Sequence, residues 1–276
     1  MNFMIIGDFG TGDIHQLKVA DSMINLIKNN DIKFICGLGD SIYDSGVKSI
    51  KDKKFKTHFE NPYKDIKLKF YHCLGNHDYG DIYNSKVIPK NYKYQIEYSK
   101  ISKKWVLPKR YYHYSKNINN VKICFFVLDT NLDLMSECEI HTQLQYFKNI
   151  IKKSKGDWYI LYGHHTYRSV SGHGNAEDLL EDFLNELFSL NKINIYMCGH
   201  DHTKQYIIKD NLHIIICGTG GFPYDYITDL KNMKDCKLNF LSENLGVGLL
   251  KCKKKSINIS FYDDSSNLEY EYEIKK

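Results

Sequence analysis

Acidic, phenolic, amide and imidazole side chains recur at five places in this sequence, each directly after an apolar segment. These residues are Asp8, Asp40 with Tyr43, Asn76 with His77, His164, and His200 with His202. Such a mixture of ligands suits paired transition metals, whereas calcium prefers oxygen ligands alone. No cysteine stands at these positions, which argues against a structural zinc cage. Two histidines one residue apart are weak evidence alone, but the five places together predict a metal site.

The pattern at each of these places predicts the end of a β-strand followed by a turn that contains glycine. The candidate strands cover residues 3–6, 34–38, 69–74, 158–162 and 193–197. An amphipathic helix with Leu17, Ala20, Ile24 and Ile27 on one stripe separates the first two strands. This strand–helix–strand order predicts a parallel α/β sheet, whose functional groups gather beyond the carboxyl ends of the strands.

The remainder of the chain alternates further strands with helices. Two strands, 111–115 and 121–128, are predicted to pair around an Asn119-Asn120 turn, and helices are predicted near 142–153 and 176–190. Later strands are expected at 212–217, 246–251, 256–262 and 268–274, while the tyrosine-rich region 85–109 is placed only loosely. Since the sequence shows no internal repeat or linker, we expect one domain over residues 1–276.

The composition is typical of a soluble globular protein, with 42% hydrophobic and 26% charged residues among 276. The net charge of +5 comes from lysine, and Arg110 and Arg168 are the only arginines, so we expect no nucleic-acid partner. No apolar run is long enough to span a membrane, and Met1 begins the first strand, so neither a membrane association nor a leader is expected. We expect a monomer.

Six of the eight cysteines lie in apolar or strand-like segments without the spacing of zinc fingers. They are Cys36, Cys73, Cys124, Cys198, Cys217 and Cys252. We interpret them as buried free thiols, which favours a reducing compartment and therefore a cytoplasmic or otherwise intracellular location.

Five motifs resemble the signature of the calcineurin-like metallophosphoesterases. They are Gly7-Asp8-Phe9-Gly10, Gly39-Asp40-Ser41-Ile42-Tyr43, Gly75-Asn76-His77-Asp78, Gly163-His164 and Gly199-His200-Asp201-His202. Tyr43, three residues after Asp40, narrows the resemblance to the purple acid phosphatases, and the small tartrate-resistant type is the most similar. The resemblance implies an α/β fold that is a four-layer α-β-β-α sandwich, in which two mixed sheets pack face to face between helices.

The resemblance also implies how two metal ions would be held. The first, Fe³⁺, would take Asp8, Tyr43 and His202; the second, Fe²⁺, Zn²⁺ or Mn²⁺, would take Asn76, His164 and His200; and Asp40 would bridge them. A hydroxide on such a pair would attack phosphorus directly. The implied activity is that of an acid phosphatase, a hydrolase whose substrates would be small phosphomonoesters or phosphoproteins.

Three residues are expected to assist the metals. His77 would stabilise charge on the phosphoryl or leaving-group oxygens, and Asp78 would orient His77. His173 lies nine residues beyond His164, where the family places a histidine that protonates the leaving group; a solvent-exposed loop histidine is the alternative.

Other positions have alternative interpretations. Arg168 stands where the related enzymes have an aromatic residue, and it is expected either to contact substrate phosphate or an acidic group, or to lie on the surface. Phe222 and Tyr224 would line the cleft or serve aromatic packing, and His165 follows a ligand directly.

The sequence also departs from the family. Residues 129–140 form a shorter loop than in the mammalian enzymes, and Cys138 has no cysteine partner near Asp178, so their disulfide is expected to be lost. Three alternatives to a phosphomonoesterase stay open: a phosphodiesterase or pyrophosphatase on the same fold, a redox protein, and a non-catalytic scaffold that kept the fold.

Overall fold

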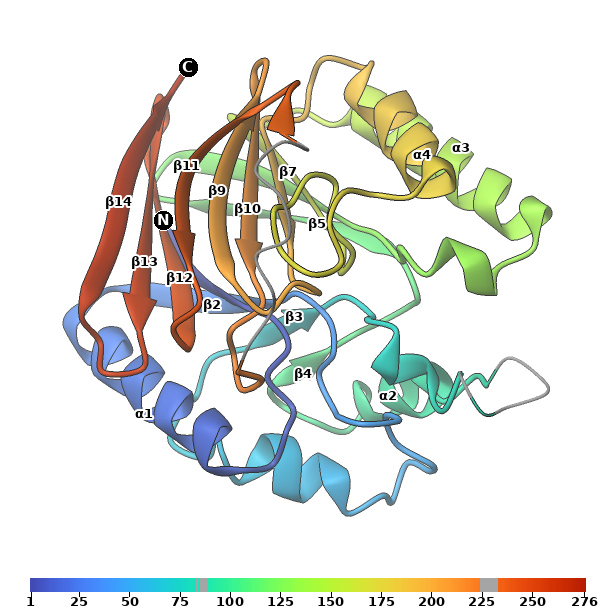
Figure 1. Cartoon of the computed structure of the whole chain (residues 1–276), viewed down its shortest axis with the longest axis vertical. Coiled ribbons are helices and arrows are strands. Elements are labelled where there is room, and N and C mark those ends of the chain that lie inside the picture. Colours follow the sequence, from blue (N-terminus) through green and yellow to red (C-terminus); the bar gives the residue numbers. More distant parts are fainter. Residues whose placement is uncertain (83, 85–88, 224–232) are drawn as a thin grey trace.

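Two β-sheets packed face to face form the centre of the molecule in the computed structural model, which describes residues 1–82, 84, 89–223 and 233–276 (Figure 1). The first sheet contains β1 (Asn2–Ile6), β2 (Ile32–Gly37), β3 (Phe70–His72), β4 (Trp105–Val106), β12 (Gly246–Cys252), β13 (Ser256–Asp263) and β14 (Leu268–Lys275). The second contains β5 (Tyr112–Ile118), β6 (Val121–Val127), β7 (Trp158–Tyr162), β8 (Ile195–Cys198), β9 (Lys204–Lys209), β10 (Leu212–Cys217) and β11 (Lys237–Ser242).

Both sheets are mixed. The strand order is β14-β13-β12-β1-β2-β3-β4 in the first sheet and β11-β9-β10-β8-β7-β6-β5 in the second. The strands β1 to β4 run parallel, as do β6, β7, β8 and β10, and the outer strands join them antiparallel. The predicted hairpin is confirmed, because Asn119 and Asn120 both have positive φ, 53° and 60°, as a two-residue turn between β5 and β6 requires.

The central strands of the second sheet, β6, β7, β8 and β10, are buried on both faces, which explains why their sequences are nearly continuous apolar runs. In β7, Ile160 and Tyr162 belong to the core between the sheets, whereas Leu161 belongs to the core beneath the helices. Across the interface between the sheets, the rings of Phe3 and Phe125 meet edge to face with centroids 5.4 Å apart. Alternate residues of one strand therefore serve two cores.

Helices complete the sandwich on its outer faces (Figure 1). They are α1 (Ile14–Asn29) on the first sheet, α3 (Glu137–Lys153) and α4 (Asp178–Phe188) on the second, and α2 (Tyr92–Tyr98) near β4, with a π-helical turn at Phe55–Glu60. Buried leucine and phenylalanine side chains of α4 pack on the sheet beneath it. The predicted four-layer α-β-β-α arrangement is confirmed.

Several elements differ from the sequence prediction. The helix α3 begins at Glu137 instead of near residue 142, because Ser136 and Glu139 form a capping box that satisfies its first amides. The strands β9 and β11 were not predicted, and β9 begins with Lys204 and Gln205, which are fully buried polar residues that interrupt the hydrophobic pattern.

The cysteines follow the expectation, since all eight are free thiols and the six predicted ones are buried. Within the part of the chain that is described, no helix has the length and apolar character needed to cross a bilayer.

Candidate metal centre

The five predicted strand ends meet at one edge of the sandwich. The strands β1, β2 and β3 lie side by side in the first sheet, β7 and β8 are neighbours in the second, and each is followed by its candidate ligand. Asp8, Asp40 and His200 have φ values of 56°, 46° and 71°, a left-handed conformation that non-glycine residues rarely adopt. The sharp turn at each of these residues brings its side chain to the centre. Backbone strain of this kind is common at functional sites.

Glycines next to the ligands allow the strand ends to come close together. A Cβ atom on Gly75 would lie 2.1 Å from Asp40 Oδ1, and one on Gly199 would lie 2.3 Å from Asp8 Oδ2. Any side chain at these positions would displace a carboxylate. Gly75 and Gly199 are therefore required by the ligands that neighbouring strands deliver.

The three side chains predicted to hold the first metal lie together. Tyr43 Oη is 3.1 Å from Asp8 Oδ1 and 3.4 Å from His202 Nε2, and His202 Nε2 is 3.7 Å from Asp8 Oδ1. Burial and the carboxylates of Asp40 and Asp8 raise the pKa of Tyr43 well above its usual value. The phenolate form consequently requires a cation beside it.

The side chains predicted to hold the second metal surround His164 Nε2. This atom lies 3.1 Å from Asn76 Oδ1, 3.2 Å from His200 Nδ1 and 3.3 Å from Asp40 Oδ2. The opposite ring nitrogen, Nδ1, donates a hydrogen bond to the Leu38 carbonyl at 2.8 Å, which leaves the Nε2 lone pair directed at the two oxygens. Facing lone pairs need a cation between them, so this donor set fits a metal ion.

Asp40 lies between the two sets, as a bridging ligand should. Ligand atoms of Asp8, Asp40 and His164 all lie within 4.8 Å of one another, and all three residues are buried. Burial raises the pKa of Asp8, whereas His164 and His77 outweigh burial and lower the pKa of Asp40. Burial also disfavours charge on His164, but Asp40 and Asp8 raise its pKa to about 10. Metal binding would therefore displace protons from this cluster.

His77 stands at the solvent side of the bridging carboxylate. Its backbone N–H donates to Asp40 Oδ1 at 3.0 Å, its ring contacts the Tyr43 ring with centroids 4.6 Å apart, and Nδ1 bonds to the Asp44 carbonyl. That bond leaves Nε2, 3.9 Å from Asp40 Oδ2, on the side of the centre. The position agrees with a role in stabilising charge on a bound phosphoryl group.

The prediction that Asp78 orients His77 is wrong. The buried Asp78 carboxylate accepts hydrogen bonds from the backbone N–H groups of Ser41 and Gly75 and from Gln95 Nε2 at 2.9 Å. Asp78 is the second residue of a 3₁₀ turn that begins at His77, and its side chain is buried whereas that of His77 is partly exposed. Asp78 consequently joins the turns after β2 and β3.

His173 lies beside the second ligand set, as the resemblance implied. Its ring stacks on the His200 ring, with centroids 3.9 Å apart and an interplanar angle of 25°. Its backbone N–H donates to Asp201 Oδ1 at 2.8 Å, and Asp201 also accepts a hydrogen bond from the Ser169 hydroxyl. Gln205 Nε2 donates to the same hydroxyl at 2.7 Å, so buried polar groups fix the loop that carries His173.

Arg168 was predicted to contact substrate phosphate or an acidic group, or to lie on the surface, and it contacts acidic groups of the chain itself. Its side chain is only 6% exposed; Nη2 bonds to Glu181 Oε1 at 2.5 Å and Asp235 Oδ2 at 3.0 Å, and Nη1 donates to the Tyr167 carbonyl. With the bond from Nε to Asp235, these partners take four of the five N–H groups of the guanidinium. Arg168 therefore ties α4 to the segment before β11.

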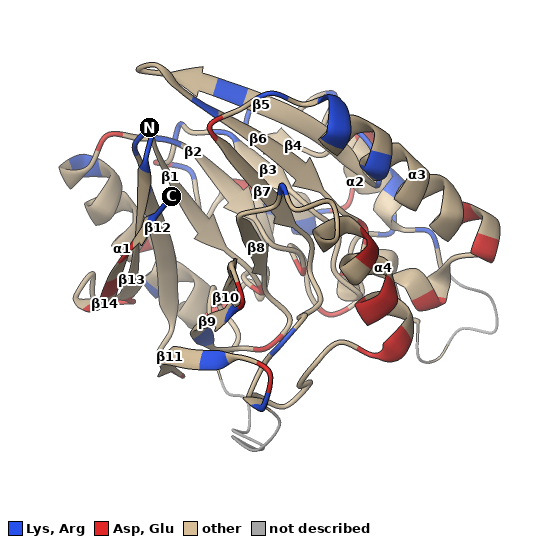
Figure 2. Ribbon diagram, turned by 90° about the horizontal axis from the view of Figure 1, so that it is seen from above, with Lys and Arg blue, Asp and Glu red and all other residues tan. Residues whose placement is uncertain are grey.

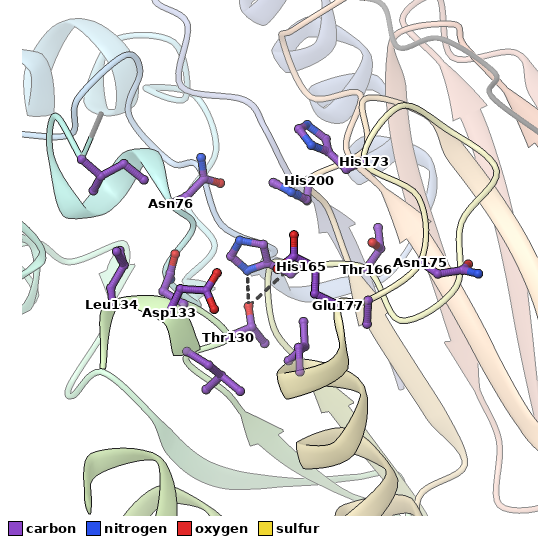
Figure 3. Close-up of a pocket in the computed structure, with 15 residues that line it drawn as sticks. Asn76, Thr130, Asp133, Leu134, His165, Thr166, His173, Asn175, Glu177 and His200 are labelled. Atoms are coloured by element: carbon purple, nitrogen blue, oxygen red, sulfur yellow. Dashed lines mark hydrogen bonds between the residues drawn. The ribbon is translucent and has the colours of Figure 1, made fainter. Parts of the chain in front are cut away.

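A cavity of about 400 Å³ adjoins the second ligand set (Figure 3). Its walls are formed by Asn76, Ile82, Thr130, Asn131, Leu132, Asp133, Leu134, His165, Thr166, His173, Asn175, Ala176, Glu177, Leu180 and His200. Thr130 and Asn131 were missed at the sequence level, although they follow β6 as the ligands follow the other strands. The same strand-end rule would have found them.

Aromatic residues border the first ligand set. The Phe222 ring contacts the His202 ring at 4.6 Å and the Tyr43 ring at 5.0 Å, which confirms that Phe222 lies beside the centre. Tyr224, the other residue expected there, is outside the described residues.

Comparisons with known proteins agree with this geometry. Residues 1–204 match the family model of the calcineurin-like phosphoesterases. Tartrate-resistant acid phosphatase type 5 of Sus scrofa is 29% identical over 96% of this chain and 84% of its own. The human protein of that name is 30% identical over 80% of this chain and 73% of its own. Purple acid phosphatase 4 of Arabidopsis thaliana is 27% identical, covering 100% and 84%.

Two solved structures share the fold over the whole chain. GAP50, described as the anchor in the inner membrane complex of Plasmodium, has a TM-score of 0.83 at 22% identity and is covered over 88% of its chain. A purple acid phosphatase from yellow lupin seeds has a TM-score of 0.76 at 15% identity and is covered over 53%. With its motifs, its relatives and its sandwich in agreement, the chain belongs to the calcineurin-like phosphoesterase family and, within it, to the purple acid phosphatases of the tartrate-resistant type.

Proposed function

We propose that this chain is a dinuclear metal-dependent phosphatase that hydrolyses phosphomonoesters. One observation carries the proposal: seven side chains of the metal-binding types converge as two sets that share Asp40, with the close approaches around Asp8 and His164 described above. A pair of metal ions at such a site supplies Lewis acidity, clamps phosphate oxygens and lowers the pKa of water to about 7.

The two ligand sets favour different metals. A phenolate at Tyr43 with the carboxylate of Asp8 is a hard, anionic environment that suits Fe³⁺, whereas the amide and two imidazoles of Asn76, His164 and His200 suit Fe²⁺, Zn²⁺ or Mn²⁺. The protein residues would then bind and orient the ester. His77 would donate to a phosphoryl oxygen, and His173, at the cavity beside His200, would donate a proton to the departing oxygen.

The test is to purify the protein, determine its metal content and record its visible spectrum together with its hydrolysis of p-nitrophenyl phosphate, bis(p-nitrophenyl) phosphate and pyrophosphate. We expect two metals per chain, a charge-transfer band in the visible that Tyr43→Phe abolishes, and preference for the monoester. Asp40→Asn should lose both metals and activity, and an exposed-site control, His141→Gln on α3, should lose neither.

The other outcomes separate the alternatives. A colourless but active zinc or manganese enzyme would refute the iron assignment and leave the phosphatase. Preference for the diester or pyrophosphate would replace the substrate class. A scaffold would be favoured if the folded protein hydrolyses none of the three substrates after metal loading and if Asp40→Asn leaves its binding to partner proteins unchanged. Such a role is suggested by the description of GAP50 as an anchor.

A further inference from the structure

The cavity beside the second ligand set is the natural place for the part of a phosphoester that leaves. Asn76 and His200 lie at one end of it, and His173 stands next to His200 (Figure 3). A phosphoryl group held at the metal centre would therefore place its ester substituent in this space. A volume of about 400 Å³ accommodates one small organic group.

Part of the cavity wall is apolar. It consists of Ile82, Leu132, Leu134, Ala176 and Leu180. Leu132 and Leu180 are buried and fixed by the core beneath α3 and α4. An aromatic or aliphatic body would bury surface against this wall, which favours binding in proportion to the area covered.

A buried acceptor in the wall lacks a donor. Asn131 is 4% exposed and lines the cavity, and its Oδ1 has no hydrogen-bond partner among the described residues. The amide orientation is fixed because Nδ2 donates to Asp129 Oδ1 at 2.9 Å, and Asp129 is itself paired with Arg110 at 3.0 Å. The Oδ1 atom is itself enclosed by the surrounding protein, so Asn131 shapes the wall and presents no open acceptor to a ligand.

The rim of the cavity is acidic. Asp133 lies in the turn before α3, and Glu177 is the residue that directly precedes α4. The two side chains lie on either side of His165 in Figure 3. Both are exposed, and neither forms an ion pair with another residue that the structure describes. The neighbouring α4 carries four carboxylates and no lysine or arginine, and Figure 2 shows acidic residues gathered on α4 and the nearby end of α3.

This local charge runs against the net charge of the chain, which is +5. An acidic rim repels leaving groups that carry carboxylates or further phosphates and attracts ammonium groups. The phosphate itself is held at the metal centre and does not need the rim.

We propose that this cavity selects phosphomonoesters whose leaving group joins an apolar body to a cationic group, and rejects leaving groups that carry additional negative charge. The proposal rests on the proposed phosphatase function and names its substrate class. Asp133 and Glu177 are its specificity determinants.

Three aryl phosphates of similar phenol chemistry test the charge preference directly. Tyramine O-phosphate carries an ammonium group, 4-ethylphenyl phosphate is neutral at that end, and 3-(4-phosphonooxyphenyl)propionate carries a carboxylate. With the metal-loaded enzyme we expect kcat/KM to fall in that order, with about a tenfold ratio between the first and last substrates, and chiefly through KM. Salt at about 0.5 M should reduce the ratio, because exposed charges are screened.

The double variant Asp133→Asn with Glu177→Gln should bring the ratio of ammonium to carboxylate substrate to about twofold or less. The matched control is Asp21→Asn, an exposed carboxylate on α1 at the opposite side of the sandwich (Figure 1), which should leave the ratio unchanged. The salt dependence of the unsubstituted enzyme tests the same point without any variant.

The outcomes distinguish a failure of the charge selection from a failure of the phosphatase function. If the enzyme hydrolyses all three esters with equal kcat/KM, or prefers the carboxylate, the charge selection is wrong and the phosphatase function stands. If the metal-loaded protein hydrolyses none of them, nor p-nitrophenyl phosphate, the phosphatase function itself is wrong.

Discussion

His173 has the position that a proton donor to a leaving alcohol requires. Its ring stacks on the ligand His200 at 3.9 Å and borders the cavity in which we place the leaving group. Its backbone is fixed through Asp201, so its location does not depend on substrate. Alkyl leaving groups need protonation in the transition state, whereas an acidic phenol such as p-nitrophenol departs as its anion.

The variant His173→Gln should therefore lower kcat unequally across substrates. We expect about a hundredfold loss for alkyl phosphates and less than about tenfold for p-nitrophenyl phosphate. The measurement is a plot of kcat against leaving-group pKa, which should become steeper in the variant. His141→Gln, on the exposed face of α3, serves as control. A uniform loss across the series would mean that His173 binds substrate and does not protonate it.

At the scale of single residues, the sequence predicted the metal ligands well and the contacts of Arg168 poorly. Each ligand follows a strand with a glycine, so local pattern was sufficient to find Asp8, Asp40 and His164 and the structure brings them together. Arg168 contacts Asp235, which lies 67 residues further along the chain. A local sequence pattern cannot reveal a contact between residues so far apart in the chain.

At the scale of elements, Arg168 fastens the helix that forms one wall of the cavity. It binds Glu181 in the first turns of α4 and Asp235 before β11, and its guanidinium lies 4.4 Å from the centroid of the Tyr167 ring. Burial of the guanidinium makes both ion pairs stronger than exposed ones, while the carboxylates stay partly in solvent.

Replacing this arginine should weaken the fold and spare the chemistry. Arg168→Met should lower the free energy of unfolding by about 2 kcal/mol, because Glu181 loses its partner, whereas Asp235 keeps Lys209. KM for p-nitrophenyl phosphate should stay within about twofold. Urea unfolding and steady-state kinetics check the two expectations, and Arg168→Lys should recover part of the stability. A tenfold rise in KM without loss of stability would restore a role in substrate binding.

The elements themselves were predictable where hydrophobic pattern alone decides them. The strands β7 and β10 have the predicted bounds because they are apolar and buried on both faces. The strand β9 was not predictable in that way, since Lys204 is buried by an ion pair with Glu269 at 2.7 Å, a residue of β14. Buried polar pairs between distant strands do not show in a local pattern.

For the whole molecule, the sequence pattern predicted parallel α/β architecture, and the family resemblance implied its four layers. Pattern alone could not assign the strands to two sheets, because the order β12-β1-β2 joins residues at opposite ends of the chain. What holds the first sheet together at the ligand end is an aromatic cluster. In it the His72 ring stacks on Trp105 with centroids 3.9 Å apart and contacts Phe59 and Phe70.

Such a histidine makes the stability of the whole fold depend on pH. His72 is fully buried, its Nδ1 shares a hydrogen bond with Ser41 Oγ at 3.1 Å, and its Nε2 has no partner among the described residues. Burial lowers the pKa of His72 from 6.5 to about 3. Between these values the unfolded chain binds a proton that the folded chain does not, so the stabilising contribution is complete above pH 6.5 and is lost as pH falls toward 3.

The variant His72→Leu should remove this dependence. At pH 7.5 it should be less stable than the unsubstituted protein by about 1 kcal/mol, because Ser41 loses its partner. At pH 5 the difference should shift by about 2 kcal/mol in favour of the variant, since each pH unit below 6.5 costs about 1.4 kcal/mol while His72 stays neutral. Urea unfolding of both proteins with a chelator present, so that metal release adds nothing, measures the shift. The control variant His141→Leu, on the exposed face of α3, should show no such shift. If the free energies of unfolding of the unsubstituted protein and of His72→Leu change in parallel with pH, His72 takes up its proton inside the folded protein.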